Sequence, residues 1–303
     1  MINSFIHIIL LLLLPPLLLG VINKTKALFA GRRGPPLLQL YYDLFKLARK
    51  DVVISQVTTW IFSAAPAITL VAIILAGLLV PMGPFQAPVV FAGDMILFAY
   101  LLGVGRFFTT AAALDTGSAF EGMGASREVT FACLSEPALF FALLVLARIS
   151  GSLELTAMLH APMTIGSQAP VASLVLVAVG VFILMLTESC RVPVDDPNTH
   201  LELTMIHEVM VLDHSGPLLG LILYGASLKL FVLCALLLHI VFPFSVGSAL
   251  PDWLLFVAEM LFMASVIGVI ESVMARLQMR HVPHLLIAAT LFCGFGFVLL
   301  MRS

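Results

Sequence analysis

The feature that most constrains this chain is a series of long apolar runs. A helix crosses the hydrocarbon core of a bilayer with about 20 mostly apolar residues. The runs that we assign to spans are residues 4–22, 60–80, 91–114, 129–149, 168–188, 217–241, 252–276 and 283–301. Only 11% of the residues are charged, against about 25% in a soluble domain. The sequence predicts an all-α integral membrane protein with about eight transmembrane helices, forming a single polytopic membrane domain over residues 1–303.

The charge and cysteine content exclude some classes of function. The net charge is only −2 and no basic tract carries interleaved aromatic residues, so nucleic-acid binding is not indicated. The four cysteines are widely separated and match no familiar iron–sulfur spacing. We therefore expect no cofactor and no metal in this chain and assign any electron transfer to other subunits.

The distribution of Lys and Arg predicts the orientation, because cytoplasmic loops carry an excess of basic residues. Seven lie between the first two runs: Lys24, Lys26, Arg32, Arg33, Lys46, Arg49 and Lys50. Other loops on that side hold Arg127, Arg191, Arg276 and Arg280, whereas the opposite side holds Arg148 and Arg302. Residues 23–59 and 189–216 are thus predicted to be long cytoplasmic loops that dock partners, with both termini outside the cytoplasm. No basic residue precedes the first run, which favours a retained span over a cleaved signal peptide.

The first long loop contains a candidate amphipathic helix. Leu37, Leu40, Leu44 and Leu47 recur at helical spacing within residues 37–50. Such a helix can lie on the membrane surface.

The second long loop runs from Glu188 into a second helical pattern. Asp196 is suited to cap a helix that starts at Pro197. One face of this expected helix holds His200, Thr204, His207, Glu208, Val211 and His214, and the apolar face carries two carboxylates, Glu202 and Asp213. These carboxylates either pair with arginines such as Arg191 or Arg106, or line a water-filled proton route. Neighbouring histidines are two turns apart, about 10.5 Å, too far to share one metal ion.

Several charged residues fall inside the apolar runs. They are Arg106, Glu136, Lys229 and Glu259. A charge within a span is costly and is usually functional, so a proton path or a charge relay is expected for Glu136, Lys229 and Glu259. A static ion pair is the alternative, and it is the preferred interpretation for Glu271, which lies close to Arg276 in the sequence.

Two stretches of the sequence resemble a known family. Gly31-Arg32-Arg33-Gly34-Pro35, followed by Gln39, Asp43, Lys46 and Lys50, resembles the first-loop motif of respiratory complex I subunit 1. The pattern of Glu188, Arg191, Pro193 and Asp195, ending at Glu202, resembles the other signature of that family. Quinone-reducing members carry a Phe and a series of glutamates at places where this chain has Val194, Asp196, Asn198 and His200. Residues 193–208 look instead like the membrane subunit of group 4 nickel-iron hydrogenases, the formate hydrogenlyase subunit 4-like family.

The resemblance implies a non-catalytic anchor and energy-coupling subunit of a hydrogenase complex in the bacterial cytoplasmic (inner) membrane. The implied partners are the hydrogenase large and small subunits, iron–sulfur subunits and an antiporter-like membrane subunit. A nickel-iron centre and iron–sulfur clusters would belong to those partners, and the energy released would drive proton or sodium translocation. Residues assigned to partner docking are Arg32, Arg33, Gln39, Asp43, Lys46 and Arg191. Residues assigned to proton relay or coupling are Arg106, Glu136, Glu188, Asp195, Asp196, Glu202, Glu208, Asp213, Lys229 and Glu259.

Three other functions stay open at the level of the sequence. A quinone-binding subunit 1 of respiratory complex I would share the fold. A free-standing secondary transporter would be expected to show internal repeats, and the two halves of this chain are not similar. A purely structural anchor would not need the buried Lys229 and Glu136.

Overall fold

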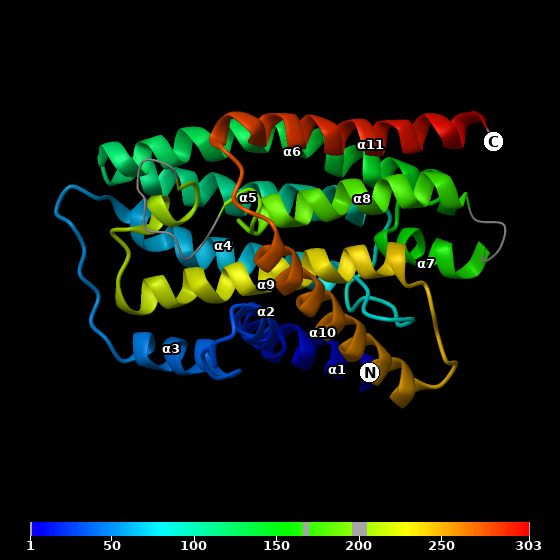
Figure 1. Cartoon of the computed structure of the whole chain (residues 1–303), viewed down its shortest axis with the longest axis horizontal. Helices are drawn as coiled ribbons and strands as arrows, with labels where there is room; N and C mark the ends of the chain where they lie inside the picture. Colours follow the sequence, from blue (N-terminus) through cyan, green and yellow to red (C-terminus); the bar gives the residue numbers. More distant parts are fainter. Residues whose placement is uncertain (1, 166–169, 196–204, 303) are drawn as a thin grey trace.

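The computed structural model describes residues 2–165, 170–195 and 205–302 and is almost entirely helical there (Figure 1). The α-helices are α1 (Ile2–Leu13), α2 (Pro15–Phe29), α3 (Gln39–Ala48), α4 (Trp60–Leu79), α5 (Asp94–Asp115), α6 (Ala119–Ser150), α7 (Leu155–Ile165), α8 (Val171–Glu188), α9 (Gly216–Val241), α10 (Ala249–Val273) and α11 (Val282–Arg302). Two short 3-10 helices, η2 (Glu208–Val211) and η3 (Met279–His281), precede α9 and α11. The all-α fold class is confirmed.

The described helices include seven that are long and apolar enough to cross a membrane, or eight if α1 and α2 together form one bent span. This range confirms the prediction of about eight. The largest difference in boundaries is at α6, which begins at Ala119 rather than near residue 129. The helix extends beyond its apolar part, so a hydropathy run locates the membrane segment but not the start of the helix.

The first predicted span is broken by a 48° bend between α1 and α2. Pro15 and Pro16 have no amide hydrogen, so they cannot continue the hydrogen bonding of the preceding helix. The freed carbonyls are satisfied by side chains from other helices: the Tyr224 hydroxyl donates to the Leu12 carbonyl at 2.7 Å, and the Tyr41 hydroxyl donates to the Leu13 carbonyl. Neighbouring polar groups thus compensate for a proline break inside an apolar segment.

Two other segments differ from the elements expected from the sequence. Residues 150–167 were assigned to no element, and α7 lies within them and packs on α6 and α9. The helix expected from Pro197 to about His214 is wrong over its described part, since only η2 interrupts an irregular path over residues 205–215. Met205, Ile206, Val209, Met210, Val211 and His214 are all buried, and on one helix these positions would cover about 240° of the circumference, more than a single face. Packing on several sides therefore overrides the helical pattern.

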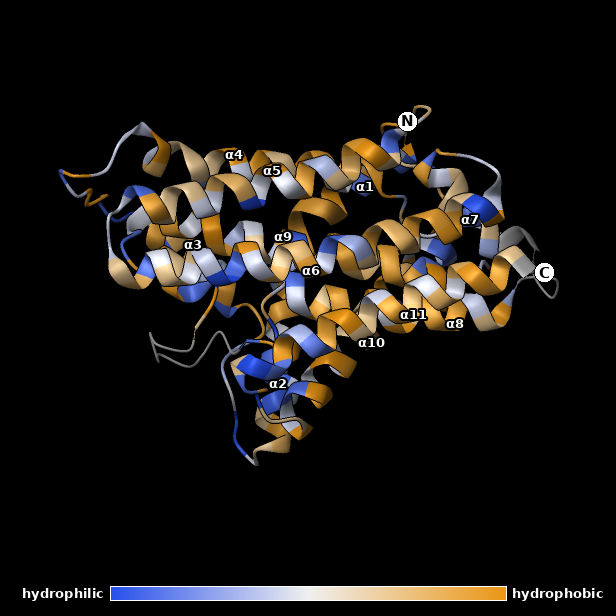
Figure 2. Cartoon of the chain, turned by 90° about the horizontal axis from the view of Figure 1, so that it is seen from above, coloured by the Kyte–Doolittle hydropathy of each residue, from blue (hydrophilic) through white to orange (hydrophobic). Residues whose placement is uncertain are grey.

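The predicted amphipathic helix is confirmed as α3, and its apolar face packs against the bundle. Leu44 and Leu47 lie against Gly220 of α9, where an added β-carbon would be in ordinary van der Waals contact, 3.5 Å from the Leu47 β-carbon. Among the described spans α9 is the most buried, with 67% of its most apolar 18-residue stretch buried inside the bundle. Apolar residues predominate along the long helices in Figure 2, and hydrophilic residues gather near α2 and at the ends of the bundle.

Candidate functional site

Five charged side chains from four helices meet inside the bundle. Arg106 of α5 lies at their centre, with its Nη1 atom 2.6 Å from Glu136 Oε1 and its Nε atom 3.7 Å from Glu128 Oε1. Its Nη2 atom contacts Glu188 Oε1. Lys229 Nζ of α9 lies 2.6 Å from Oε2 of Glu188. Glu188 therefore bridges two cations, and we call these five residues the charge cluster.

The charge cluster is unevenly buried. The side chains of Glu188 and Arg106 are only 7% and 10% exposed, whereas that of Glu136 is 49% exposed. When all five groups are ionised, three carboxylates face two cations, so one negative charge is left uncompensated. Because each buried ion costs several kcal/mol to desolvate, every member depends on its neighbours. The gain or loss of one proton would change the pairing of the whole cluster.

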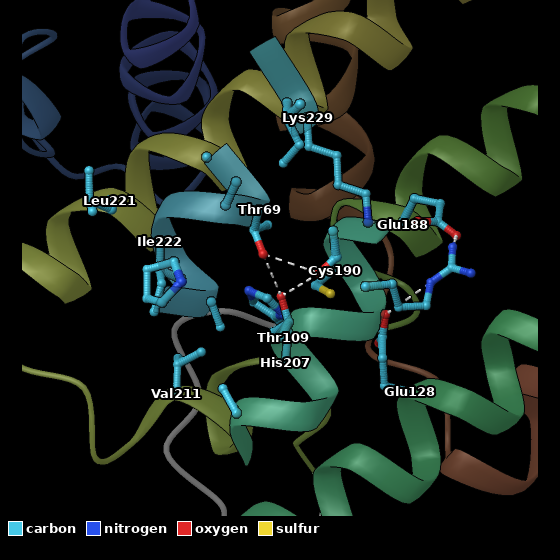
Figure 3. A pocket seen from close by; sticks show the side chains of 18 of the residues that line it. Thr69, Thr109, Glu128, Glu188, Cys190, His207, Val211, Leu221, Ile222 and Lys229 are labelled. Carbon is cyan, nitrogen blue, oxygen red and sulfur yellow. Dashed lines mark hydrogen bonds and ion pairs between the residues drawn. The ribbon is translucent and has the colours of Figure 1, made fainter. Parts of the chain in front are cut away.

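A cleft opens beside the charge cluster, and its space, together with the open solvent at its mouth, is about 850 Å³. Arg106, Glu128, Glu188 and Lys229 line it together with apolar residues of α4, α5 and α9. Figure 3 shows the amine of Lys229 directed toward Glu188. The cleft thus combines an apolar wall with a small number of buried charges, which is the general character of a ligand or water-filled site.

The second long loop is held beside the charge cluster by Asp195. This side chain is buried, and its Oδ2 atom accepts hydrogen bonds from the amides of Ile206 at 3.0 Å and His207 at 3.3 Å. Its Oδ1 atom lies 2.9 Å from Arg276 Nη2. A second, much smaller pocket is lined by Asp195 and by Glu128 and Glu188 of the charge cluster. The loop and the charge cluster therefore share one internal space.

Three titratable groups in the loop segments have shifted pKa values. Burial lowers the pKa of His207 below its usual value, although the nearby Glu208 opposes this effect. Burial also lowers the pKa of His214, whose ring stacks on Phe62 with 4.0 Å between centroids. Burial raises the pKa of the Cys190 thiol well above its usual range. At neutral pH both imidazoles and the thiol are uncharged, so the fixed charge beside the cleft comes from the charge cluster.

A second ion-pair network joins the two long loops. Glu271 Oε2 of α10 lies 2.7 Å from Lys26 Nζ at the end of α2, and Glu271 Oε1 lies 3.3 Å from Arg191 Nη1. The static ion pair expected for Glu271 is confirmed, but its partners are Lys26 and Arg191, while the nearby Arg276 pairs with Asp195. Glu271 thus connects the start of the first loop to the start of the second.

The coupling residues predicted from the sequence fall into three groups. Arg106, Glu136, Glu188 and Lys229 belong to the charge cluster, and Asp195 shares its cavity. Glu208, Asp213 and Glu259 do not join it: Asp213 is exposed at the surface, Glu208 has no ion pair to another described residue, and Glu259 lies on α10 away from both cavities. Asp196 and Glu202 lie outside the described residues.

The predicted docking residues differ in exposure. Arg32, Arg33 and Lys46 are exposed. Gln39 Nε2 donates to Asp43 Oδ1 at 2.9 Å, one turn away on α3. Arg191 is buried and paired with Glu271, so it supports the second loop from within rather than presenting a side chain to a partner.

Glu128 is the member of the charge cluster that the sequence analysis missed. It follows Arg127 and precedes the apolar run at residue 129, so it looks like a loop residue. Because α6 begins earlier, Glu128 is in fact helical and lies two turns from Ser135, which donates to Glu188 Oε1 at 3.2 Å. Glu128 and Ser135 are seven residues apart, so they lie on the same face of a helix. This spacing was the signal in the sequence that could have identified Glu128.

The described residues contain no group of three or more His, Cys, Asp or Glu side chains that could hold a metal ion. The four cysteines are unpaired: Cys133 is exposed, Cys190 is partly exposed, and Cys234 and Cys293 are buried on different helices. The ionisable side chains that come together are instead acids paired with Arg and Lys, which suits the movement of protons or charge.

A family model described as NADH dehydrogenase matches residues 2–302. The chain belongs to the NADH dehydrogenase family. Within this family, Hydrogenase-4 component C of Escherichia coli (strain K12) is 30% identical over 283 residues, which are 91% of this chain and 88% of that protein. Formate hydrogenlyase subunit 4 of the same organism is 30% identical over 305 residues, covering 97% of this chain and 95% of that protein. These relatives confirm the resemblance that residues 193–208 indicated.

A more distant relative confirms the relation to complex I. This NADH-quinone oxidoreductase subunit of Syntrophotalea carbinolica is 26% identical over 254 residues, covering 80% of this chain and 74% of that protein. The fold is similar to that of a chain in the structure of the membrane-bound sulfane sulfur reductase (MBS), an archaeal respiratory membrane complex. The TM-score is 0.82 at 20% identity, and the match covers 100% of this chain and 99% of that chain. This chain is therefore a multi-pass membrane protein with the fold of a respiratory-complex subunit.

Proposed function

We propose that this chain is the membrane anchor and energy-coupling subunit of a formate hydrogenlyase-type, group 4 nickel-iron hydrogenase complex. It links electron transfer in peripheral subunits to the translocation of protons or sodium ions. The observation that carries this proposal is the charge cluster, which shares a cavity with Asp195 of the second loop. The similarity to Hydrogenase-4 component C and Formate hydrogenlyase subunit 4 supports the choice of complex.

The proposed arrangement places residues 23–59 and 189–216 in the cytoplasm and both termini in the periplasm. The partners are the hydrogenase large and small subunits, iron–sulfur subunits and an antiporter-like membrane subunit, and the nickel-iron centre and clusters belong to those partners. The excess of Lys and Arg in the first loop supports this orientation. Arg32, Arg33, Gln39, Asp43 and Lys46 offer exposed or partly exposed polar contacts for docking.

The coupling step follows from the ion pairs. A change at the docked subunit would shift the second loop and, with it, the contact of Asp195 with Arg276 and the amides of residues 206 and 207. Because the loop shares a cavity with Glu128 and Glu188, the shift changes the surroundings of those carboxylates. Glu188 is held ionised by Arg106 and Lys229, so the proton would be taken up at Glu128, whose contact with Arg106 is only 3.7 Å. This would remove the excess negative charge of the cluster, and charge would then be redistributed within the membrane.

A quinone-binding subunit 1 of respiratory complex I is the second candidate. The observation that favours it is the cleft with an apolar wall. The two functions predict different partners and different bound molecules, which makes them separable in one preparation.

The deciding experiment is gentle detergent extraction of the tagged chain from its membrane. Copurifying proteins are identified, and nickel, iron and quinone are measured on the same sample. Nickel together with iron–sulfur subunits is the result expected for the hydrogenase. Quinone together with NADH-oxidising partners would assign the chain to complex I, and a chain that purifies alone would contradict both functions.

A further inference from the structure

Glu259 lies within the membrane-spanning part of α10 without a partner among the described residues. It is the eleventh of the helix's 25 residues, about 15 Å from the start at 1.5 Å per residue. No ion pair or hydrogen bond joins its carboxylate to another part of the described chain, in contrast to Glu271 on the same helix. A carboxylate at such a depth is costly and calls for a compensating group.

The surroundings of Glu259 on α10 are apolar. Helix geometry places it about 80° from the centre of the buried face formed by Phe256, Met260 and Ile267. Leu255 and Phe262 lie about one helical turn before and after Glu259, farther from the buried face. Phe262 is 55% exposed. Glu259 itself is half-buried. The carboxylate therefore lies at the edge between the bundle and its surroundings.

Neither lipid nor a second copy of the chain suits this position. Lipid tails offer no hydrogen-bond donor, and the short Glu side chain cannot extend to the interface as Lys and Arg do. A second copy related by two-fold symmetry would bring two Glu259 carboxylates toward each other, and like charges repel strongly at low dielectric. A cation carried by another helix offsets the desolvation of the carboxylate by forming a buried ion pair.

We propose that the strip of α10 formed by Leu255, Glu259 and Phe262 is the docking site for a transmembrane helix of another membrane subunit, which presents a Lys or Arg to Glu259. The proposal rests on the proposed function only in that the chain must be part of a multisubunit membrane complex. It separates Glu259 from the charge cluster and assigns it to assembly. Figure 1 shows α10 crossing the bundle obliquely at its edge, beside α2 and α9.

Site-specific photocrosslinking in the intact complex tests the proposal. A benzophenone amino acid replaces Phe262 in the tagged chain, and in a matched control it replaces Leu254, which is 71% exposed but about 140° around the helix from Glu259. We expect an adduct from position 262 with one membrane subunit, mapped by mass spectrometry to a helix that carries a Lys or Arg. Position 254 should give at least fivefold less of that adduct.

Two variants decide whether the carboxylate matters. E259L should reduce the adduct from position 262 several-fold, and E259K combined with a Glu in place of the partner's cation should restore it. An adduct with a second copy, an adduct that E259L leaves unchanged, or no protein adduct at position 262 would overturn the proposal. Nickel and peripheral subunits in the same sample test the proposed function separately, so their presence without the adduct rejects the docking site alone.

Discussion

At the scale of single residues, Glu188 is the carboxylate that joins the two cations of the charge cluster. Its two oxygens contact Arg106 and Lys229, which come from helices far apart in the sequence. Removing one partner of a buried ion pair destabilises a protein by more than the pair itself stabilises it, because the remaining charge stays desolvated. The two cations therefore depend on Glu188 more than on the partly exposed Glu136.

We expect Glu188→Gln to destabilise the complex by about 3–5 kcal/mol, because it leaves two buried cations with weaker compensation. Glu136→Gln should cost less, since that side chain is 49% exposed. Both variants should assemble, and both should reduce hydrogen-linked ion transport several-fold in membrane vesicles. Thermal unfolding in detergent gives the stability, and a transport rate unchanged in both variants would reject the charge cluster as the coupling element.

The histidines of the second loop predict the pH dependence of stability. Burial lowers the pKa of His207 and His214 in the folded chain, whereas the unfolded chain takes up protons near pH 6.5. The unfolded state therefore binds more protons at low pH, so stability is full above about pH 6.5 and falls below it.

We expect the melting temperature of the purified complex to fall between pH 7.5 and 5.5. His214→Phe keeps a ring against Phe62 and removes one titrating group, so it should make the melting temperature less dependent on pH in that range. An identical slope in the variant and the parent would show that His214 does not contribute.

At the scale of elements, the sequence predicts apolar spans well and their surroundings poorly. A run of apolar residues is a local property, so α4, α5, α8 and α9 lie close to their predicted positions. The start of α6 and the existence of α7 depend on packing against other helices, which no local pattern records. The irregular path of residues 205–215 has the same cause, because Asp195 and the bundle fix it from outside the segment.

Glycines at helix crossings give a test of packing at this scale. A β-carbon added at Gly296 of α11 would lie 3.1 Å from the Ser173 carbonyl oxygen and 3.2 Å from Val177 of α8, whereas one added at Gly294 meets nothing within 4 Å. We expect Gly296→Leu to destabilise the protein by about 1–3 kcal/mol through overpacking. Gly294→Leu, two residues away on the same helix, should be nearly neutral. Thermal unfolding of the two variants compares them directly, and equal melting temperatures would contradict the close approach of α8 and α11.

At the scale of the whole molecule, the identities of most site residues were predictable but their partners were not. The motifs and the cost of buried charge single out Arg106, Glu136, Glu188 and Lys229. The pairing of Arg276 with Asp195, 81 positions apart, depends on how α10 and the second loop meet. Long-range pairing of this kind follows from the arrangement of the helices. No local pattern in a single sequence predicts it.

The bent pair α1–α2 makes the topology of the whole chain testable. If both helices form one span, there are eight crossings and the two termini lie on the same side of the membrane; if they re-enter on one side, there are seven and the termini lie on opposite sides. The Tyr224 and Tyr41 hydroxyls that satisfy the carbonyls at the bend allow the pair to sit at membrane depth as one span. We expect epitope tags at both ends to be accessible in right-side-out spheroplasts and protected in inverted vesicles. A tag inserted near residue 54, between α3 and α4, should show the opposite accessibility. If the N-terminal tag instead has the same accessibility as the residue-54 tag, the chain crosses the membrane seven times.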